Sequence, residues 1–561
     1  MSRPLIAVPA RFSESASALR HRAIVGSRNL ISLIYAAGGE PLLVHPHAPG
    51  GVVSDEEVAE RVRPNQNYFQ RKERPDGDKR MDKVFDVTAM LALPKFAAAV
   101  ISMAFPSNQR YQSLVPGDPS LEDDPQIKRY LEGLTDLLFR VRYAPQANFI
   151  SQSGESILDV GAFGTGILFV DDVLGLGIRY KSFPLAECYI AEDAHGRTDT
   201  LHRKFKFSAH QAATLFGLDK LPERMRTAYD KNRNEKFDFL HCVVPNPEKK
   251  PGRRDYRGMD YWSCYIAYED RKLIDEGGFR VFPFAIPRYE TNARECYGRS
   301  PAMNVLPAIK LLNEQKKTVL RAGQRVVDPP IMLSDDGSLA AFNVRPNALN
   351  YGYVGPDGRP LALPFHTEGR VDIGLDMMKA EQEAINDAFL VTLFRILAEE
   401  PQITATEAML RAQEKGQLLA PTMGRMQTEL LGPTTQREID VLFHAGVIDA
   451  VLGPMPKKLL DAGGEIKIEY QSPLNLAQRA GAGMAIMNTL QAIAPLAQVD
   501  QSVMLVFDPV EMARELADIN GMPAKCVRSP DEVEALKAQA SQAQAAQQLL
   551  AAAPVAAGAA K

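Results

Sequence analysis

Few residues of this chain stand in patterns that could support catalysis. The glycine-rich run Gly161–Gly166 leads from an expected helix into an expected strand. A dinucleotide-binding loop has the opposite order, because there the helix N-terminus must face the phosphates. The sequence also lacks a P-loop pattern, so we expect neither a nucleotide cofactor nor an ATP motor of that class.

Carboxylates, histidines and cysteines form no better site. Asp123–Asp124 and Asp171–Asp172 stand where aspartate is typical of turns. His45 and His47 have no carboxylate or cysteine partner at metal-ligand spacing. The cysteines are scattered and no CxxC occurs, which argues against a zinc site or a disulfide framework and fits a reducing compartment: Cys188, Cys242, Cys264, Cys296 and Cys526. We therefore expect no catalytic residue, no metal and no cofactor.

The clearest chemical signal is a group of cations on one long expected helix. Its apolar residues recur every seven positions and leave a narrow stripe: Val305, Leu312, Val319 and Val326, with Ile309 between them. Cations crowd the remaining surface: Lys310, Lys316, Lys317, Arg321 and Arg325. Taken alone, this pattern is typical of an ordinary amphipathic helix on a large globular protein.

Local signals define the ends of this helix. Ser300 is a good N-cap and Pro301 a good first helical residue. Pro307 should kink or restart the helix, because it lacks an N–H and crowds the preceding turn. Asp328–Pro330 should end it, since a residue before proline is disfavoured in the α region. A rod of about 30 Å results.

A second long helix is expected from Asp372 to about Ala398, with an acidic first half. Between the two rods lies a small insert with strand patterns at Ile331–Leu333, Leu339–Val344 and Leu361–Pro364, so the two ends of the insert must lie close together. A short loop follows at Glu399–Ile403. A capping box at Thr404–Glu407 then starts another helix.

The preceding body should mix helices with an antiparallel meander. We expect helices at Val84–Ala104 (broken at Pro94), Asp124–Tyr143 and Gln146–Val160, and a helical patch at Ser208–Tyr229. Strands are expected at Gly166–Val170, Gly177–Phe183, Cys188–Glu192, Thr198–Phe207, Phe237–Val244, Tyr261–Tyr268 and Arg280–Ile286. Towards the C-terminus we expect a helix at Thr422–Val447 interrupted at Pro433, a strand at Ile466–Tyr470, helices at Leu474–Ala494, Pro509–Ile519 and Pro530–Leu550, and a frayed tail.

Composition sets wide bounds. A chain of 561 residues has room for about two to four domains. The net charge of −4 gives no global basic field of the kind that marks many nucleic-acid binders, although a protein that lets DNA slide does not need one. We expect no signal peptide, because residues 1–10 lack a long apolar core. The most apolar window, Val84–Phe105, contains charges and a proline, so we expect a buried helix and no membrane span.

The first 63 residues form a separate pattern. A strand at Pro4–Pro9, a helix over residues 20–37 and a strand at Pro41–His45 predict a β-α-β start. The run RPLIAVPARFS…YAAGGEPLLVHPHAPGG resembles the N-terminal end of class I glutamine-amidotransferase-like γ-glutamyl hydrolases. Those enzymes need a nucleophilic cysteine on a G-x-C-x-G elbow, which this chain lacks. We therefore expect no amidotransferase activity.

The remainder of the chain, from about residue 64 to 540, resembles another family. The run G-R-S-P-A-M-x-x-L-P-x-I-K-x-L-N-E at Gly298–Glu314 is similar to the portal, or head-to-tail connector, proteins of short-tailed bacteriophages. Further matches, in the same order, are Val327–Pro330, Thr404–Glu407 and Tyr470–Leu474. Gly161–Asp171 and the strand Arg197–Phe207 match as well.

The resemblance implies an α+β portal fold and a ring of about twelve identical subunits. The parts would be a mixed α/β wing at 64–300, stem helix 1 at 301–327, a β-containing clip at 328–371, stem helix 2 at 372–398, a tunnel loop with wing helices at 399–473, wing and crown helices at 474–550 and a flexible tail at 551–561, after an atypical segment at 1–63.

The implied function is that of a channel and not of an enzyme. Double-stranded DNA would pass through a ring at one capsid vertex during packaging and ejection. The ring would contact the major capsid and scaffolding proteins, the terminase large subunit and tail adaptor proteins in the virion, after assembly in the host cytoplasm. Candidate channel residues are Lys310, Lys317, Arg321, Arg325, Glu399, Glu400 and Gln402. The alternatives are an amidotransferase-like hydrolase with an appended domain and a structural virion protein that forms no channel.

Overall fold

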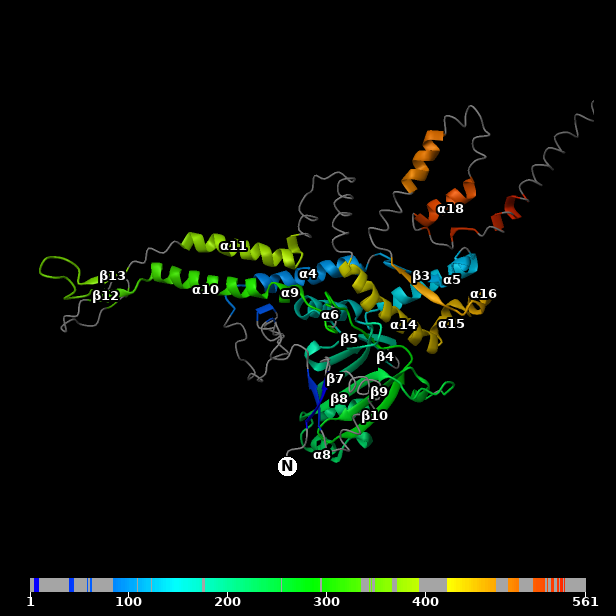
Figure 1. The fold of residues 1–561 in the computed structure, drawn as a ribbon, viewed down its shortest axis with the longest axis horizontal. Coiled ribbons are helices and arrows are strands. Elements are labelled where there is room, and N and C mark those ends of the chain that lie inside the picture. Colours follow the sequence, from blue (N-terminus) through cyan, green and yellow to red (C-terminus); the bar gives the residue numbers. More distant parts are fainter. Residues whose placement is uncertain are drawn as a thin grey trace, which may run out of the picture.

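The structure is a computed structural model in which helices and strands are mixed (Figure 1). It describes residues 84–107, 109–122, 124–173, 177–253, 255–292, 295–333, 349–365, 371–392, 421–470, 483–493 and 508–519, the strands at 5–9 and 40–44, and isolated residues between 58 and 62, 343 and 345, and 522 and 539. A mixed body forms the centre, and one narrow arm projects from it.

Helices make up much of the body and most of the arm. They are α4 (Thr88–Ala104), α5 (Pro125–Arg142), α6 (Phe149–Phe163), α7 (Ala209–Phe216), α8 (Glu223–Lys231), α9 (Pro301–Asn304), α10 (Leu306–Val327), α11 (Val371–Ala388), the π-helix η7 (Met426–Leu431), α14 (Gly432–His444), α15 (Val447–Leu452), α16 (Lys457–Asp461) and α18 (Pro509–Ile519). No described helix is long and apolar enough to cross a membrane.

The larger sheet of the body is an antiparallel meander in the order β10-β9-β8-β7-β6. Its strands are β6 (Cys188–Glu192), β7 (Thr198–Ser208), β8 (Lys236–Pro245), β9 (Tyr261–Ala267) and β10 (Lys272–Phe279). A second sheet has the order β11-β4-β5, with β4 (Leu168–Val173), β5 (Gly177–Ser182) and β11 (Phe284–Ala285). The meander is confirmed, but the two strands expected at its start belong to the second sheet.

Smaller strand pairs complete the fold. The strands β3 (Gln112–Pro116) and β14 (Ile466–Tyr470) pair antiparallel and join distant parts of the chain. The strands β12 (Ile331–Leu333) and β13 (Ala362–Pro364) pair at the end of the arm. The strands β1 (Leu5–Pro9) and β2 (Glu40–Val44) pair in parallel, as a β-α-β start requires, while the helix expected between them lies outside the described residues.

The helix α5 shows how closely some sequence signals match the structure. Asp124 caps it, and its carboxylate accepts hydrogen bonds from the N–H groups of Gln126 at 2.9 Å and Ile127 at 3.4 Å. Every residue of the expected apolar face is buried: Ile127, Tyr130, Leu131, Leu134, Leu137 and Leu138. Asp124, expected in a turn, is therefore the N-cap of α5.

Two helix breaks that we predicted at proline residues are absent from the structure. The helix α4 continues through Pro94, although we expected a break there. The helix around Pro433 is also continuous, because the π-helix η7 precedes it. The wider π turn accommodates a residue that has no N–H to donate and whose ring crowds the preceding turn.

Other boundaries differ from the expectations as well. The helix α6 lies three residues later than expected. The helix α11 begins at Val371 and ends at Ala388, because Leu390 adopts a left-handed φ of 58° that an α-helix cannot contain. Residues 391 and 392 are helical again, and the rest of the expected helix, to Ala398, lies outside the described residues. Asp171–Asp172 lie within β4 and not in a turn. The sequence reading missed β3 and β10, and the strand expected at Arg280–Ile286 is reduced to β11.

A fully buried ion pair joins the helical part of the body. The guanidinium of Arg142 on α5 donates to the Glu438 carboxylate on α14, with Nε–Oε1 at 2.9 Å and Nη2–Oε2 at 2.7 Å. It also donates to the hydroxyls of Tyr111 at 2.6 Å and Thr435 at 2.8 Å. The Tyr180 hydroxyl donates to the same carboxylate from β5. Both charges therefore have partners without water.

Candidate functional site

The arm starts at a tight junction with α6. The Ser300 hydroxyl accepts a hydrogen bond from the Met303 N–H at 2.9 Å and donates one to the carbonyl of Ala162 at 2.7 Å. Gly164 ends α6 with a φ of 80°, and a Cβ atom there would lie 2.3 Å from the carbonyl oxygen of Gly298. The glycine-rich run thus permits backbone contact at the base of the arm, which explains its composition without a phosphate ligand.

The expected restart of the helix is confirmed. The short helix α9 ends at Asn304, and α10 begins at Leu306, with Pro307 in its first turn, where a missing N–H costs nothing. The cap at Asp328 agrees with the predicted end.

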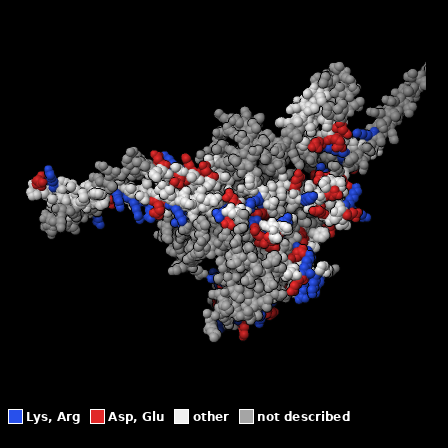
Figure 2. Space-filling model, viewed as in Figure 1, with Lys and Arg blue, Asp and Glu red and all other residues white. Residues whose placement is uncertain are grey.

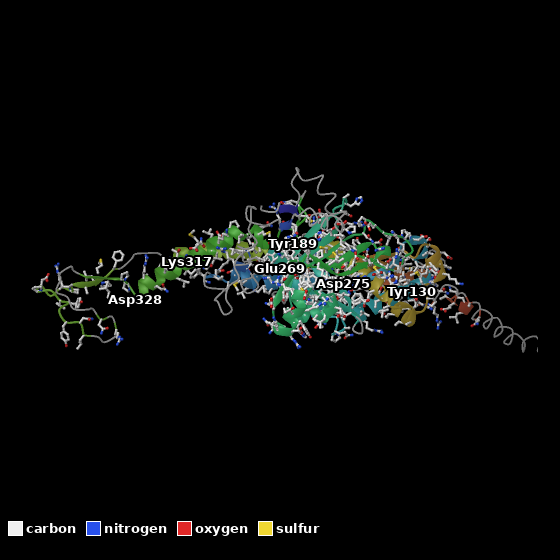
Figure 3. The ribbon with its side chains drawn as sticks, turned by 90° about the horizontal axis from the view of Figure 1, so that it is seen from below. Tyr130, Tyr189, Glu269, Asp275, Lys317 and Asp328 are labelled. Carbon is white, nitrogen blue, oxygen red and sulfur yellow. The ribbon has the colours of Figure 1, made fainter. Side chains whose placement is uncertain are left out.

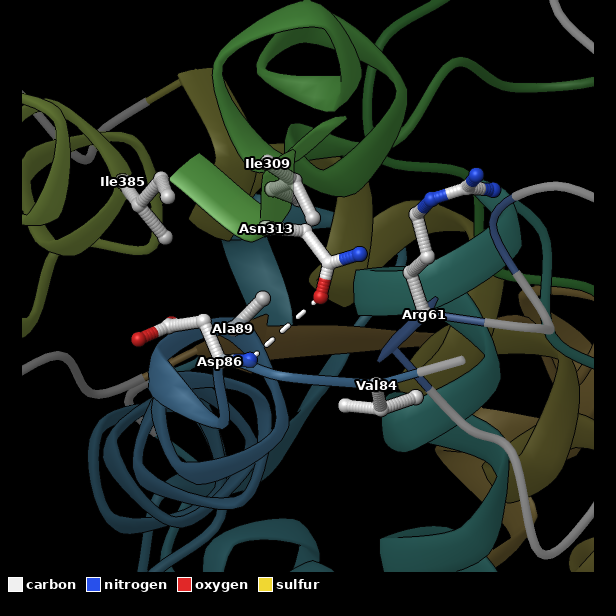
Figure 4. A pocket seen from close by; sticks show the side chains of 7 residues that line it. All are labelled: Arg61, Val84, Asp86, Ala89, Ile309, Asn313 and Ile385. Carbon is white, nitrogen blue, oxygen red and sulfur yellow. Dashed lines mark hydrogen bonds between the residues drawn. The ribbon is translucent and has the colours of Figure 1, made fainter. Parts of the chain in front are cut away.

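Asn313 fastens α10 to the segment before α4 (Figure 4). Its side-chain oxygen accepts hydrogen bonds from the N–H groups of Phe85 at 2.7 Å and Asp86 at 3.3 Å. Lys316 adds an ion pair with Asp86 at 3.0 Å. Burial alone raises the pKa of Asp86, but the hydrogen bonds from Thr88 and Lys316 outweigh burial, so its pKa is lowered and it is charged at neutral pH.

Replacing Asn313 by alanine is expected to lower the free energy of unfolding by about 1–3 kcal/mol, because two backbone N–H groups lose their acceptor. Chemical denaturation followed by circular dichroism measures the change. Thr318→Ala is the matched control, because Thr318 is exposed and its hydroxyl donates only within its own helix. Equal stability of the two variants would contradict a role of Asn313 as the fastener.

The four cations proposed for the channel lie on one stripe of α10. At about 100° per residue, Lys310, Lys317, Arg321 and Arg325 fall within one quarter of the helix circumference. The Lys317 ammonium pairs with Glu314 at 3.0 Å and lies 5.7 Å from the centre of the Phe85 ring. Lys310 is half-buried and has a partner. Arg321 and Arg325 are exposed and pair with no described residue. The other candidates, Glu399, Glu400 and Gln402, lie outside the described residues.

The helix α11 carries the opposite charge on its own outer stripe. Asp376, Glu383 and Asp387 are exposed and fall on one side of α11 by the same helical spacing. The buried Met378 and Ile385 lie on its other side, which packs on α10. Figure 2 shows the result: acidic side chains follow the α11 edge of the arm and basic side chains follow the α10 edge.

Close packing holds the two rods together. A Cβ atom on Gly374 would lie 2.8 Å from the Val319 side chain, so the helices α10 and α11 approach closely there. The strands β12 and β13 close the arm, and the Phe365 N–H donates to the Pro330 carbonyl at 2.8 Å. The prediction that the ends of the insert meet is confirmed.

The apolar stripe of α10 changes from buried to exposed along the arm. Leu312, near the body, is 1% exposed, whereas Val326 is 55% and Val327 86% exposed. In Figure 3, Lys317 lies part-way along the arm and Asp328 lies at the end of α10. Beyond α10 the insert adds more exposed apolar side chains: Met332, Leu349, Tyr351, Val354, Leu363 and Phe365. Leu320, Val327, Pro330 and Ile331 line an open hollow there, together with Arg321 and Arg325. So much apolar surface is typical of an interface.

Arg288 connects the sheets to the π-helix. Its guanidinium pairs with Glu429 of η7 at 2.7 Å and with Glu192 at the end of β6, and its backbone N–H donates to Glu429 at 2.9 Å. Sequence reasoning missed Arg288, Arg142 and Asn313, because a single sequence gives no sign of which polar residues are buried.

The cysteines and the acidic side chains are the remaining candidates for chemistry. Within the described part of the chain, no three His, Cys, Asp or Glu side chains come together as a metal site. Cys188, Cys242 and Cys264 lie buried in strands, and Cys296 is buried as well. None of them occupies a strand-to-helix elbow of the kind that an amidotransferase nucleophile needs.

Residues 54–527 match the family of bacteriophage head to tail connecting proteins. The chain belongs to this family. It is 27% identical over 504 residues to a probable portal protein of Bordetella phage BPP-1 and 25% identical over 501 residues to the portal protein of Salmonella phage epsilon15. Each alignment covers 88% of this chain and 88% of the relative. The resemblance seen in the sequence is confirmed.

Solved structures of gene transfer agent particles are also similar. One is the neck of an empty particle, with 13% identity, a TM-score of 0.35 and coverage of 73% of this chain and 90% of the other. Another is the neck of a native particle, with 12% identity, a TM-score of 0.35 and coverage of 72% and 87%.

Proposed function

We propose that the chain forms the portal ring at one capsid vertex, the channel through which double-stranded DNA enters and leaves the head. Family membership and two relatives named as portal proteins support this function. The observation that carries it in the structure is the arm, whose two outer edges bear opposite charges.

An arm of this kind suits a head-to-tail contact between copies. If the α10 edge of one copy meets the α11 edge of the next, each copy offers one surface of each kind, and the same contact repeats until the ring closes. The guanidinium groups of Arg321 and Arg325 would then face the start of α11 in the next copy, where the carboxylate of Asp376 is exposed. The exposed Val326 and Val327 at the end of α10 would become buried in the same contact.

The parts of the chain take roles accordingly. Residues 64–300 form the wing, α10 and α11 the stem, residues 328–371 the clip and the segment after residue 474 wing and crown, in a ring of about twelve copies. The exposed tyrosine and aliphatic side chains of the clip are suited to dock the terminase large subunit during packaging and tail adaptor proteins afterwards. Major capsid and scaffolding proteins would surround the wing in the virion.

Passage of DNA needs only weak, repeated contacts to phosphates and no base readout. Arg321 and Arg325 suit the contact between copies. Lys310 and Lys317 lie nearer the body on the same stripe, and we assign the contacts with DNA phosphates to these two lysines. Both ammonium groups are partly engaged within the chain, which keeps their hold on phosphate weak.

Replacing Lys310 and Lys317 by glutamine is expected to leave rings intact and to reduce the salt dependence of duplex DNA binding by the ring. The reason is that each lost phosphate contact lowers the slope of log K against log salt by about 0.9. Binding titrations of a short duplex at several salt concentrations measure this slope. Lys379→Gln on α11, a 70% exposed side chain, is the control. A slope equal to that of the unaltered ring would show that neither lysine contacts the DNA phosphates.

A further inference from the structure

A row of four side chains that can carry out chemistry crosses the five-stranded sheet. Direct cross-strand pairing places His202 of β7 opposite Cys242 of β8, and Cys242 opposite Cys264 of β9. Cys264 in turn lies opposite Glu276 of β10. Directly paired residues of an antiparallel sheet point to the same face. This thiol row therefore holds two cysteines side by side, between an imidazole and a carboxylate.

The spacing of the two cysteines suits a covalent bond between them. Both are free thiols and both are 0% exposed. Directly opposed residues of an antiparallel pair have Cα atoms about 4.5–5.5 Å apart. Disulfides span Cα separations of about 4.4–6.8 Å, so the backbone of β8 and β9 does not have to move. Cys188 is also buried in this sheet, but its cross-strand partner is Arg203 and not a thiol.

The neighbours of the two thiols make them chemically unequal. The hydrogen bond with the Cys264 thiol and the nearby His202 imidazole lower the pKa of Cys242 to about 5, against the effect of burial. Burial and the same hydrogen bond raise the pKa of Cys264. Burial alone lowers the pKa of His202, but the adjacent Cys242 outweighs it, so the pKa of the imidazole is raised. Cys242 is thus suited to be the attacking thiolate and Cys264 the second thiol.

The polar ends of the row distinguish it from a purely apolar packing of two cysteines. His202 and Glu276 are half-buried, whereas the thiols between them are buried. The Nδ1 atom of His202 is buried and has no hydrogen-bond partner among the described residues. Glu276 accepts a hydrogen bond from the Trp262 indole N–H at 2.8 Å. A half-buried imidazole beside a buried thiol is the arrangement that an attacking cysteine needs.

We propose that Cys242 and Cys264 are a redox-active pair, which hydrogen peroxide converts into a cross-strand disulfide. The Cys242 thiolate attacks one peroxide oxygen, the O–O bond breaks, and the leaving hydroxide takes a proton from the His202 imidazolium. The Cys264 sulfur then attacks the sulfenic acid on Cys242, and its proton leaves with the hydroxyl group as water. The two sulfurs give up two electrons, and the peroxide becomes two water molecules. Because reducing compartments keep thiols free, the bond ties β8 to β9 only where such an oxidant is present.

Peroxide treatment of the full-length Cys526→Ser protein tests the proposal, because this change removes the exposed thiol that could link two copies. After acid quenching, the protein is denatured and alkylated, and its peptides are analysed by mass spectrometry. Cys242 should be found joined to Cys264, while Cys188 and Cys296 are alkylated and act as internal controls. Dithiothreitol should make the joined pair open to alkylation again.

Two controls make this result decisive. Cys242→Ser in the same background should abolish the link and leave Cys264 open to alkylation. The peroxide dose is the one that oxidises the exposed Cys526 thiol of the unaltered protein. The proposal is wrong if Cys242 and Cys264 are alkylated as fully as Cys188 at that dose, or if they are oxidised without being joined.

Replacing His202 by asparagine tests the part of the imidazole. The rate of disulfide formation should reach its plateau at higher pH in the variant, because the Cys242 thiolate has lost its neighbouring cation. Tyr189 and Glu276, the other titratable groups of the row, are unchanged in this comparison. A merely structural role would change the rate without moving the midpoint of the pH profile. Equal midpoints in the two proteins would exclude His202 from the reaction.

Discussion

Replacing Glu438 by glutamine is expected to lower the free energy of unfolding by about 3–5 kcal/mol, because removal of one partner leaves a buried charge uncompensated. Arg142 is 0% exposed, and the carboxylate of Glu438 takes two of its hydrogen bonds. The variant also weakens the hydrogen bond from Tyr180. Urea denaturation of the full-length protein measures the loss.

Two further variants make this result specific. Asp136→Asn removes a carboxylate from the pair with Arg110, whose side chains are 45% and 50% exposed, and should cost only about 0–1 kcal/mol. Replacing both Arg142 and Glu438 by apolar residues of similar volume should recover much of the loss, because no charge then stays buried. A Glu438→Gln variant as stable as Asp136→Asn would contradict the role assigned to the buried pair.

Reversing Arg321 and Arg325 to glutamate is expected to prevent ring closure. Like charges would then face each other where the α10 edge of one copy meets the α11 edge of the next. Juxtaposed like charges across an interface cost several kcal/mol, so the protein concentration needed for assembly should rise more than about tenfold. Size-exclusion chromatography with light scattering over a concentration series measures this shift.

A compensating substitution on α11 makes this test specific for the contact between copies. Combining the reversed arginines with Asp376→Arg should restore rings, since opposite charges then face each other again at the start of α11. Arg224→Glu is the control, because Arg224 is an exposed ion-paired cation of the body and not of the arm. If rings form normally with the reversed arginines alone, these side chains do not lie in the contact between copies.

The arm was largely predictable from the sequence, because it is built from local signals. The cap at Ser300, the restart at Pro307 and the stop at Asp328 each act within one helical turn, and all three are found in the structure. The charge of the two rods could be read directly as well. The sequence could not predict that the two charges lie on opposite outer edges of the arm. Their position depends on which sides of α10 and α11 pack together at Gly374 and Val319.

The errors arose where tertiary context overrides local preference. Pro433 breaks an isolated helix, but here a π turn precedes it, and Glu429 within that turn is fixed by Arg288 from a distant part of the chain. Leu390 gives no warning of its left-handed conformation, which shortens α11. Asp171 and Asp172 favour a turn by residue type, yet pairing with β5 holds them in a strand.

Imaging of the purified protein by negative-stain electron microscopy tests the central claim most directly. The charged edges and the apolar arm predict closed rings with a central hole, formed from this chain alone and more abundant as protein concentration rises. Monomers or dimers that persist at high concentration would contradict the assembly, and with it the channel.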